Sequence, residues 1–353
     1  MKHLLLTLLS VVMLANATYA QDSIWNKVKH AVSQLNDLNE QYIEPQHYNF
    51  TVMMQATSAY DIFTIRSDDG QRLTLANDMN LKVGPYFGWR WFFLGYTFDL
   101  KNIGFSGGKI KREFDLSIYS SRFGVDLFYR RTGDAYKLRN ANLGKDVDAS
   151  NLEGMSFDGV SAGITGVNAY YIFNHKRFSY PAAFSQSTVQ KISCGSLIAG
   201  AGYTRNSLTL DYQKLQNAID ASCGYGVVKL DSSLMFDKAD YHDISLSAGY
   251  AYNFVLPHHI LLAVSGQAAL AYKRSATRSA TEHQAAFNFQ DINIDGIGRF
   301  GAVYNNMRWY AGASLIVHTN NYRKSNFYSS NIFGSINIYV GYNFGLKKKY
   351  RRT

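Results

Sequence analysis

The stretch NIFGSINIYVGYNF, residues 331–344, alternates apolar and polar side chains along its whole length. The apolar face carries Ile332, Ile336, Ile338, Val340, Tyr342 and Phe344, and the opposite face is mainly asparagine, serine and glycine. Successive side chains of a β-strand point to opposite faces of the sheet. A strand of a soluble domain has about five or six residues. This stretch is much longer and can cross a bilayer when tilted.

The same period of two recurs along the chain from residue 48 onward. It predicts strands at 48–58, 79–89, 91–101, 112–119, 122–132, 158–173, 187–204, 241–254, 258–273, 289–304, 307–319 and 331–344. Bacterial single-chain barrels have an even number of strands. We therefore predict an all-β protein, a closed antiparallel transmembrane β-barrel of about 12 strands. A soluble β-sandwich is the alternative fold.

The predicted connections alternate between short turns and long loops. The short turns fall at 89–91, 120–121, 256–257 and 305–306, and the long loops at 59–78, 102–111, 133–157, 205–240, 274–288 and 320–330. Barrels have short periplasmic turns and longer surface loops. This parity predicts that both termini face the periplasm. The segment 174–186 is the exception, because it is long where a short turn is expected.

The composition of the 353 residues agrees with a barrel. Aromatic residues make up 15%, there are 28 glycines and only 4 prolines, and charged residues make up 18%. The mean hydropathy of −0.20 excludes a bundle of transmembrane helices. Strands that face lipid on one side and a polar lumen on the other average to such a value. The net charge of +10 does not indicate nucleic-acid binding, because the basic residues are scattered and no recognition motif is present.

The N-terminus has the pattern of a secretory signal peptide. A basic start is followed by the apolar run of residues 4–15 and by small residues at Thr18 and Ala20, which predicts cleavage before Gln21. A buried N-terminal helix is the alternative. The predicted organisation is therefore a cleaved signal peptide (1–20), a periplasmic N-terminal helix and linker (21–45), an outer-membrane β-barrel (46–345) and a basic periplasmic tail (346–353).

Both ends of the mature chain carry further signals. Residues 22–40 repeat apolar side chains at helical spacing, which predicts one short amphipathic helix before the barrel. The last strand ends in Tyr342-Asn343-Phe344, an aromatic-x-aromatic ending that the barrel assembly machinery reads. The basic tail that follows can touch anionic lipid headgroups, although we expect it to be solvated. Outer-membrane lipid and the assembly machinery are the predicted partners, with a periplasmic partner as a further candidate.

Two cysteines, Cys194 and Cys223, remain after export to an oxidising compartment. A disulfide between them and a pair of free thiols are both open at this stage. No Cys-x-x-Cys or His-x-x-x-His spacing occurs, so neither a metal site nor a cofactor is predicted.

Charged residues recur on the face of the strands that the alternation turns toward the lumen. These predicted lumen-lining residues are Lys82, Arg90, Asp99, Glu113, Asp115, Arg122, Asp126, Arg130, Asp243, Asp291, Asp295, Arg299 and Arg308. Buried charges are tolerated when they are paired or hydrated. Their mixed signs therefore predict ion-pair networks in a narrow interior more than an ion filter of one sign.

A lipid-active hydrolase is the alternative function, because barrel hydrolases use serine with histidine. His175 with Ser179 or Ser185 supplies these residue types, as does His242 beside Asp243. No Gly-x-Ser-x-Gly elbow is present. The preferred prediction therefore assigns no catalytic residue.

The most distinctive stretch is YYIFNHKRFSYPAAFSQ, residues 170–186, which combines basic residues with aromatic ones around a single proline. It predicts an inward plug, a periplasmic docking loop or a structural loop. Its notable residues are Asn174, His175, Arg177, Phe178, Ser179, Tyr180, Pro181, Phe184 and Gln186.

This stretch resembles the signature of a family of exported Bacteroidetes proteins catalogued as domain of unknown function 4421. YIEP at 42–45 with YNF at 48–50, GPYFGWR at 84–90 and FDLSIY at 114–119 resemble the same family. The resemblance covers nearly the whole mature chain and implies location and architecture, without an activity.

Together these features predict an outer-membrane β-barrel of a Gram-negative bacterium. Its predicted function is a narrow or gated pore for small solutes, or a structural barrel of the cell envelope.

Overall fold

The computed structural model describes residues 38–67, 69–89, 92–95, 98–99, 112–132, 136–144, 147–231, 234, 238–275, 292–324 and 327–351. The predicted signal peptide and nearly all of the predicted amphipathic helix lie outside these residues. Within the described ranges, no helix has both the length and the apolar character needed to cross a membrane.

Most of the described chain is β-strand. The strands are β1 (Ile43–Pro45), β2 (Tyr48–Ser67), β3 (Arg72–Asn77), β4 (Asn80–Trp89), β5 (Phe92–Gly95), β6 (Phe98–Asp99), β7 (Arg112–Tyr119), β8 (Phe123–Thr132), β9 (Tyr136–Asn142), β10 (Ser156–Phe157), β11 (Val160–Ile172), β12 (Thr188–Gln190), β13 (Cys194–Leu210), β14 (Lys238–Leu256), β15 (Ile260–Ser275), β16 (Ile292–Asn305), β17 (Trp309–Lys324) and β18 (Phe327–Leu346). The helices are α3 (Tyr180–Phe184) and α4 (Tyr212–Cys223), with the short 3-10 helices η3 (Ser150–Leu152) and η6 (Lys348–Tyr350).

Sixteen of these strands form one antiparallel sheet. Its order is β10-β9-β3-β2-β18-β17-β16-β15-β14-β13-β11-β8-β7, and β4 pairs with β2 and with β5 and β6. The first and last long strands, β2 and β18, are paired along nearly their full lengths. Among the described residues, no register joins β7 to β5 or β6. The predicted closure of the sheet and the predicted strand number therefore stay predictions.

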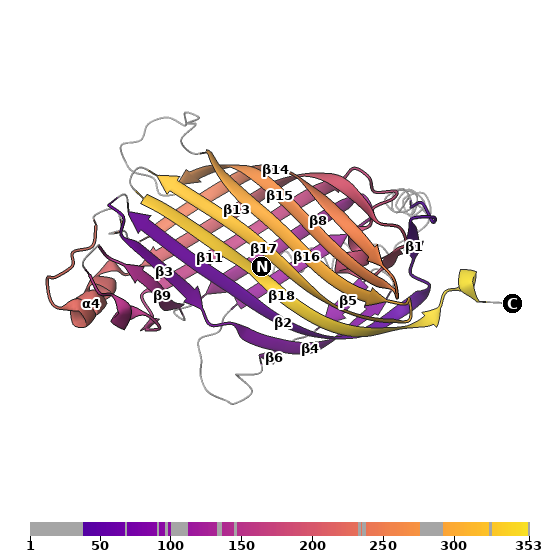
Figure 1. The fold of residues 1–353 in the computed structure, drawn as a ribbon, viewed down its shortest axis with the longest axis horizontal. Helices are drawn as coiled ribbons and strands as arrows, with labels where there is room; N and C mark the ends of the chain where they lie inside the picture. The colour runs from indigo at the N-terminus through magenta and orange to yellow at the C-terminus, as the bar shows by residue number, and fades with distance from the viewer. Residues whose placement is uncertain are drawn as a thin grey trace, which may run out of the picture.

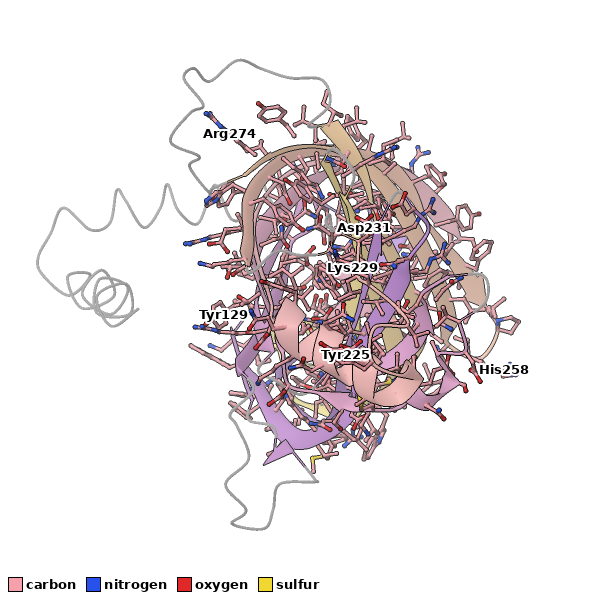
Figure 2. All side chains as sticks on the ribbon, turned by 90° about the vertical axis from the view of Figure 1, so that its left-hand side faces the viewer. Tyr129, Tyr225, Lys229, Asp231, His258 and Arg274 are labelled. Atoms are coloured by element: carbon pink, nitrogen blue, oxygen red, sulfur yellow. The ribbon has the colours of Figure 1, made fainter. Side chains whose placement is uncertain are left out.

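The sheet curls strongly, so that strands far apart in its order meet. Arg299 on β16 contacts Asp126 on β8, although four strands separate them in the sheet. A guanidinium nitrogen of Arg130 on β8 donates to the Gly334 carbonyl oxygen on β18 at 3.0 Å. Neighbouring strands lie about 4.8 Å apart, so these contacts are impossible across a flat sheet. Figure 2 shows the ribbon curving around an interior filled by side chains.

The two faces of the curled sheet have opposite polarity. On β18, Ile338 is 60% exposed and Val340 50%, whereas Tyr339 and Asn343 on the other face are 7% and 3% exposed. The alternation predicted for residues 331–344 is thus confirmed. Other strands repeat it, with Leu246 and Ile294 outside and Asp243 and Arg299 inside. The outward face is apolar and the interior is polar, which is the reverse of a soluble domain.

The two ends of the curled sheet differ. In Figure 1, α4 lies at one end, which we call the α4 end, and β1 and η6 lie at the other, which we call the terminal end. At the α4 end, β3, β9 and β10 extend the sheet, and a buried apolar core lies between them, β11, β13 and α4. Asp211 caps α4, since its side chain accepts a hydrogen bond from the Lys214 amide at 3.0 Å.

Each predicted strand range overlaps an observed strand, but one prediction was misplaced. The range 187–204 spans two separate strands: β12 pairs with β1 in a small sheet of its own, and β13 begins at Cys194 and runs on to Leu210. The predicted loops 59–78, 133–157 and 205–240 were also wrong in part. They contain the end of β2, the strands β3, β9 and β10, and α4.

Candidate functional site

The segment of residues 174–190, here called the inserted segment, folds into the interior of the curled sheet. Ser179 begins α3 as its N-cap: its hydroxyl accepts a hydrogen bond from the Ala182 amide at 3.2 Å. Pro181 follows in the first turn, where a missing N–H costs nothing. The sequence Ser-Tyr-Pro therefore starts a short helix at this point, inside the sheet.

Hydrogen bonds fasten the inserted segment to three strands. The Tyr180 hydroxyl donates to Ser265 Oγ on β15 at 2.5 Å. The Asn253 amide on β14 donates to the Ser179 carbonyl oxygen at 2.8 Å, and the Gln186 amide donates to the Tyr339 hydroxyl on β18 at 2.6 Å. A segment that bonds to strands on several sides must lie on the concave face. Of the three predicted alternatives, the inward plug is the one that this geometry supports.

Aromatic rings pack around the inserted segment. Tyr180 lies 5.6 Å from Phe178 and from Tyr170, 5.2 Å from Phe184 and 6.0 Å from Tyr119, measured between ring centroids. Such spacings are typical of favourable aromatic pairs. The rings fill the interior between β7, β11 and α3, where an open pore would hold water.

A buried ion pair lies next to these rings. The Arg299 guanidinium is fully buried and bonds to the Asp126 carboxylate. Ser117 donates to the same carboxylate at 2.6 Å, and the guanidinium carbon lies 5.1 Å from the centre of the Tyr170 ring. Because a charge buried without partners is very costly, this arrangement holds both charges in place. It joins β16 to β8 across the interior.

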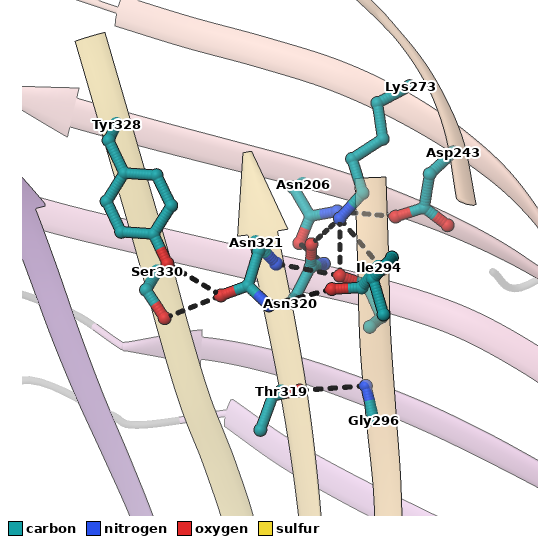
Figure 3. Close-up of polar contacts among 11 residues, drawn as sticks. Asn206, Asp243, Lys273, Ile294, Gly296, Thr319, Asn320, Asn321, Tyr328 and Ser330 are labelled. Atoms are coloured by element: carbon teal, nitrogen blue, oxygen red, sulfur yellow. Dashed lines mark hydrogen bonds and ion pairs between the residues drawn. The ribbon is translucent and has the colours of Figure 1, made fainter. Parts of the chain in front are cut away.

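A second polar network lies nearer the α4 end, on the inner face of β13 to β17 (Figure 3). The Lys273 ammonium, also fully buried, lies 2.8 Å from an Asp295 carboxylate oxygen and bonds to Asn320. Asn320 donates to Asn206 at 3.2 Å, and Asn206 donates to Asp243 at 3.3 Å. The network links one cation to two carboxylates through side-chain amides, and the stacked rings of Tyr241 and Tyr322, 4.5 Å apart, lie beside it.

The predicted lumen-lining charges do not all lie in the interior. Asp126, Arg130, Asp243 and Arg299 are buried in the interior, Asp295 pairs with Lys273, and Lys82 and Arg122 are half-buried. Arg308 is instead exposed in the turn before β17, where its guanidinium bonds to the Tyr342 hydroxyl. The side chains of Arg90, Asp99, Glu113, Asp115 and Asp291 are outside the described set.

Sequence reasoning missed Lys273 and Asp61. Lys273 lies on the same face of β15 as the buried Ala263 and Ala271. The alternation of the sequence could therefore have predicted that Lys273 points inward. Asp61, which accepts a hydrogen bond from the Tyr136 hydroxyl at 2.9 Å, fell in a predicted loop because β2 runs further than expected.

The residues of the hydrolase alternative are engaged elsewhere. His175 Nδ1 lies 3.3 Å from the Ile172 carbonyl oxygen. The Ser179 hydroxyl is 2.7 Å from that of Thr188, and the Ser185 hydroxyl donates to the Pro181 carbonyl oxygen. None of these hydrogen bonds joins the histidine to either serine. Within the described chain, no cluster of three or more His, Cys, Asp or Glu side chains could hold a metal ion.

Both cysteines are free thiols, so the disulfide alternative is not supported. Cys194 begins β13 beside Asn174, whose amide nitrogen lies 3.2 Å from the sulfur. Cys223 ends α4, with its sulfur 3.5 Å from the Asp148 carbonyl oxygen. Cys194 lies at the start of β13, whereas Cys223 lies at the end of α4, which follows the other end of that strand. This separation explains why the two cysteines do not pair.

The basic tail is partly solvated and partly packed: Lys348, Lys349 and Arg351 are exposed, in agreement with the expectation of a solvated tail, whereas Lys347 and Tyr350 are half-buried. The Lys347 amide donates to the His47 carbonyl oxygen at 2.9 Å, and the rings of His47 and Tyr350 stack with centroids 3.9 Å apart. The Lys349 ammonium lies 3.2 Å from a Glu40 carboxylate oxygen, and this hydrogen bond raises the pKa of Lys349. These contacts connect residues 347–350 to residues 40–47.

A cavity of about 650 Å³ opens at the terminal end, between the tail and the inserted segment. Its wall includes Ser185, Gln186 and Ser187 from the inserted segment, the hydroxyl pair Thr51–Tyr310, and Lys348 and Arg351 from the tail. Apolar and aromatic side chains such as Phe50 and Leu346 line it together with these hydroxyls, amides and cations. The cavity can hold a polar or anionic group beside its cations.

Three solved structures illustrate what the chain is similar to. The outer membrane protease OmpT from Escherichia coli is 8% identical, with 85% of this chain and 98% of that chain covered and a TM-score of 0.34. The translocator domain of the autotransporter NalP from Neisseria meningitidis is 11% identical (92% and 96% covered, TM-score 0.33). The toluene transporter TodX from P. putida is 10% identical (85% and 91% covered, TM-score 0.23).

No curated protein matches the sequence. A family model, however, matches residues 36–344, which include the curled sheet up to the last two residues of β18, the inserted segment and the interior ion pairs. The resemblance seen in the motifs of residues 42–50, 84–90, 114–119 and 170–186 is thereby confirmed. The chain belongs to the family described as Domain of unknown function (DUF4421).

Proposed function

We propose that this protein is a closed, twelve-strand outer-membrane β-barrel with an occupied interior, and that it serves the cell envelope as a structural barrel. In this proposal both termini face the periplasm and the α4 end faces the outside. The protein reaches the membrane through the barrel assembly machinery. A partner with an anionic group is proposed to dock at the terminal end, where Lys348 and Arg351 border the cavity.

The polarity of the sheet supports a membrane location. Outward positions carry large apolar side chains, such as Leu246 at 69% exposure and Ile244 at 63%, whereas the interior is polar. Exposed apolar surface on this scale is unfavourable in water and favourable in lipid. The helical and soluble alternatives offer no such explanation for an apolar outside and a polar inside.

The arrangement of the strands supports a closed barrel of twelve strands. We propose that β5 and β6 are parts of one spanning strand, because both pair with β4. The spanning strands are then β2, β4, β5 with β6, β7, β8, β11 and β13 to β18. Closure requires β7 to pair with the strand of β5 and β6, and the residues between them lie outside the described ranges.

The buried pair of Arg299 and Asp126 carries the proposal of an occupied interior. These two side chains bridge the interior directly, and the Tyr180 ring of the inserted segment lies beside the guanidinium, 5.9 Å from its carbon. At the α4 end, the apolar core closes the other side of the interior. Ions crossing such a barrel would have to displace a paired charge and an aromatic cluster.

A gated pore is the second candidate. The inserted segment is held by side-chain hydrogen bonds from Tyr180 and Gln186, so it could leave the interior without breaking the pairing of the spanning strands. Gating would then be an outward movement of this segment.

Conductance in planar bilayers tests the proposal. We expect no steady channels from the parent protein. A variant in which residues 178–187 are replaced by a glycine–serine linker should conduct more, and Phe254→Ala on the outward face serves as the control. Steady channels in the parent would overturn the structural barrel, and openings that depend on voltage would favour the gated pore.

Location is tested separately. A closed barrel should fractionate with outer membranes and migrate differently on a detergent gel before and after heating. A chain that stays in the aqueous fraction and shows no heat-dependent shift would be a soluble sandwich.

A further inference from the structure

Basic side chains form a line across the outward face of three adjacent strands. Arg205 on β13 is the register partner of His242 on β14, and His242 is the partner of Arg274 on β15. Their neighbours Asn206, Tyr241 and Lys273 point inward and are buried, so these three point outward. Arg205 and Arg274 are exposed, and Figure 2 shows Arg274 pointing away from the interior. We call Arg205, His242 and Arg274 the outer basic row.

The outer basic row lies at the edge of the apolar band. On β14 the outward side chains from Ile244 to Phe254 are aliphatic or aromatic, and those of Ile244, Leu246, Tyr250 and Phe254 are exposed. Ten residues at about 3.3 Å each span roughly 33 Å along a strand, which is about 25 Å of depth at a tilt near 40°. The apolar band of a barrel is about 25 Å tall. The row therefore lies where lipid headgroups begin, at the end away from the termini.

The residues around the outer basic row favour the binding of an anion. The Tyr203 hydroxyl is 2.7 Å from His242 Nδ1, and the two rings are stacked with centroids 5.9 Å apart, which fixes the imidazole. One carboxylate lies close by: Asp240, which is adjacent on the outward face of β14 and interacts with Arg205. Asp240 is also paired with Lys238 at 2.7 Å, so its charge is already offset.

We propose that the outer basic row binds the phosphate groups of a phosphorylated, multiply acylated lipid in the outer leaflet. This inference rests on the proposed outer-membrane location. Arginine binds phosphate through two parallel hydrogen bonds, and two arginines spaced by one strand can share one phosphorylated headgroup. The acyl chains would lie over Ile244, Leu246 and Leu270, which are all more than 60% exposed directly below the row.

The test compares lipid binding by the parent with that of Arg205→Ala/Arg274→Ala. Binding of bisphosphorylated lipid A to the purified protein in neutral detergent is measured by native mass spectrometry and by the shift in thermal unfolding. Each arginine near a charged lipid contributes a factor of about five in affinity, so the double variant should bind about 25-fold more weakly. Arg323→Ala, an exposed arginine on β17 outside the row, is the matched control and should bind as the parent does.

Three further binding measurements distinguish the possible outcomes. Dephosphorylated lipid A and inorganic phosphate should each give less than a tenth of the parent's shift. Arg205→Lys/Arg274→Lys should lie between the parent and the alanine variant. Equal binding by the parent and the alanine variant, or equal binding of the dephosphorylated lipid, overturns the row as a phosphate site. Binding of inorganic phosphate alone overturns the proposal that the ligand is a lipid. Loss of the outer-membrane location would appear instead in fractionation and in the heat-dependent gel shift, which are measured on the same preparations.

Discussion

Arg299 and Asp126 form an ion pair across the interior, although four strands separate β16 from β8 in the sheet order. The arginine side chain is fully buried, and the aspartate is 6% exposed. The pair is therefore direct evidence for the curl of the sheet, because its two partners meet only when the strands from β8 to β16 bend toward each other.

Arg299→Ala should be strongly destabilising, because it leaves the Asp126 carboxylate buried without its cation. The expected loss is about 3–5 kcal/mol of unfolding free energy. Urea unfolding in lipid vesicles measures it, and Arg308→Ala, at an exposed arginine, is the control with little change. The double variant Arg299→Met/Asp126→Leu should recover most of the loss. A small effect of Arg299→Ala alone would show that the pair is hydrated.

Gly124→Ala should also destabilise the fold, because a Cβ at this position would overlap Cζ of the Tyr170 ring. Tyr170 is held between Arg299 and Tyr180, so the ring has little room to move. Overpacking of this kind costs about 1–3 kcal/mol. Gly266→Ala is the matched control on β15, where nothing lies within 4 Å. Equal midpoints for the two variants would contradict the packing of Tyr170.

Tyr180→Phe removes the hydroxyl that donates to Ser265. Loss of a buried hydrogen bond should cost about 0.5–1.5 kcal/mol. A double-mutant cycle with Ser265→Ala isolates the interaction, and the two effects should be less than additive. Strict additivity would mean that the inserted segment is not fastened at this point.

The two cysteines should be free in the folded protein. Thiol labelling after unfolding without a reductant should count two groups per chain, and reduction should not change gel mobility. A protein that is two mass units lighter and reacts with no thiol reagent would contradict this geometry. Cys194→Ser and Cys223→Ser should each keep the heat-dependent gel shift.

The contact between Lys349 and Glu40 should depend on pH. The hydrogen bond raises the folded pKa of Lys349, so the contact is fully present below the unfolded pKa and is lost as the pH rises through the folded pKa. Nitrogen-15 titration of the Lys349 side chain measures this shift. In Glu40→Gln the pKa of Lys349 should fall toward its ordinary value, and an unchanged pKa would show that the tail is not held by Glu40.

The spanning strands were predictable from sequence because their signal is local. A period of two continues through residues 331–344 whatever the strand pairs with. The strands β3, β9 and β10 were missed because they are short, with six, seven and two residues, and because their buried side chains face a core at one end of the sheet. The inserted segment was recognised as an exception, but its direction depends on bonds such as Tyr180 to Ser265, between residues 85 positions apart.

The interior charges, like the strands, were predictable only as far as their signal is local in the sequence. Arg299, Asp126 and Asp243 were predicted as interior charges because strand parity alone places them there. Their pairing was not predictable, since it requires knowing which strands oppose each other across the interior. Arg308 shows the limit of parity: the turn before β17 takes it out of the strand and exposes its side chain.

The inserted segment also constrains the order of assembly. It lies between β11 and β13, so it is synthesised before the strands that later surround it. Its bonds to Asn253 and Ser265 can form once β14 and β15 are in place, whereas the bond from Gln186 to Tyr339 must wait for β18. Tyr339 is brought into the sheet when β18 pairs with β2, so this third hydrogen bond forms last. Seating of the inserted segment is thus coupled to the pairing of the last strand, because only β18 supplies the partner of Gln186.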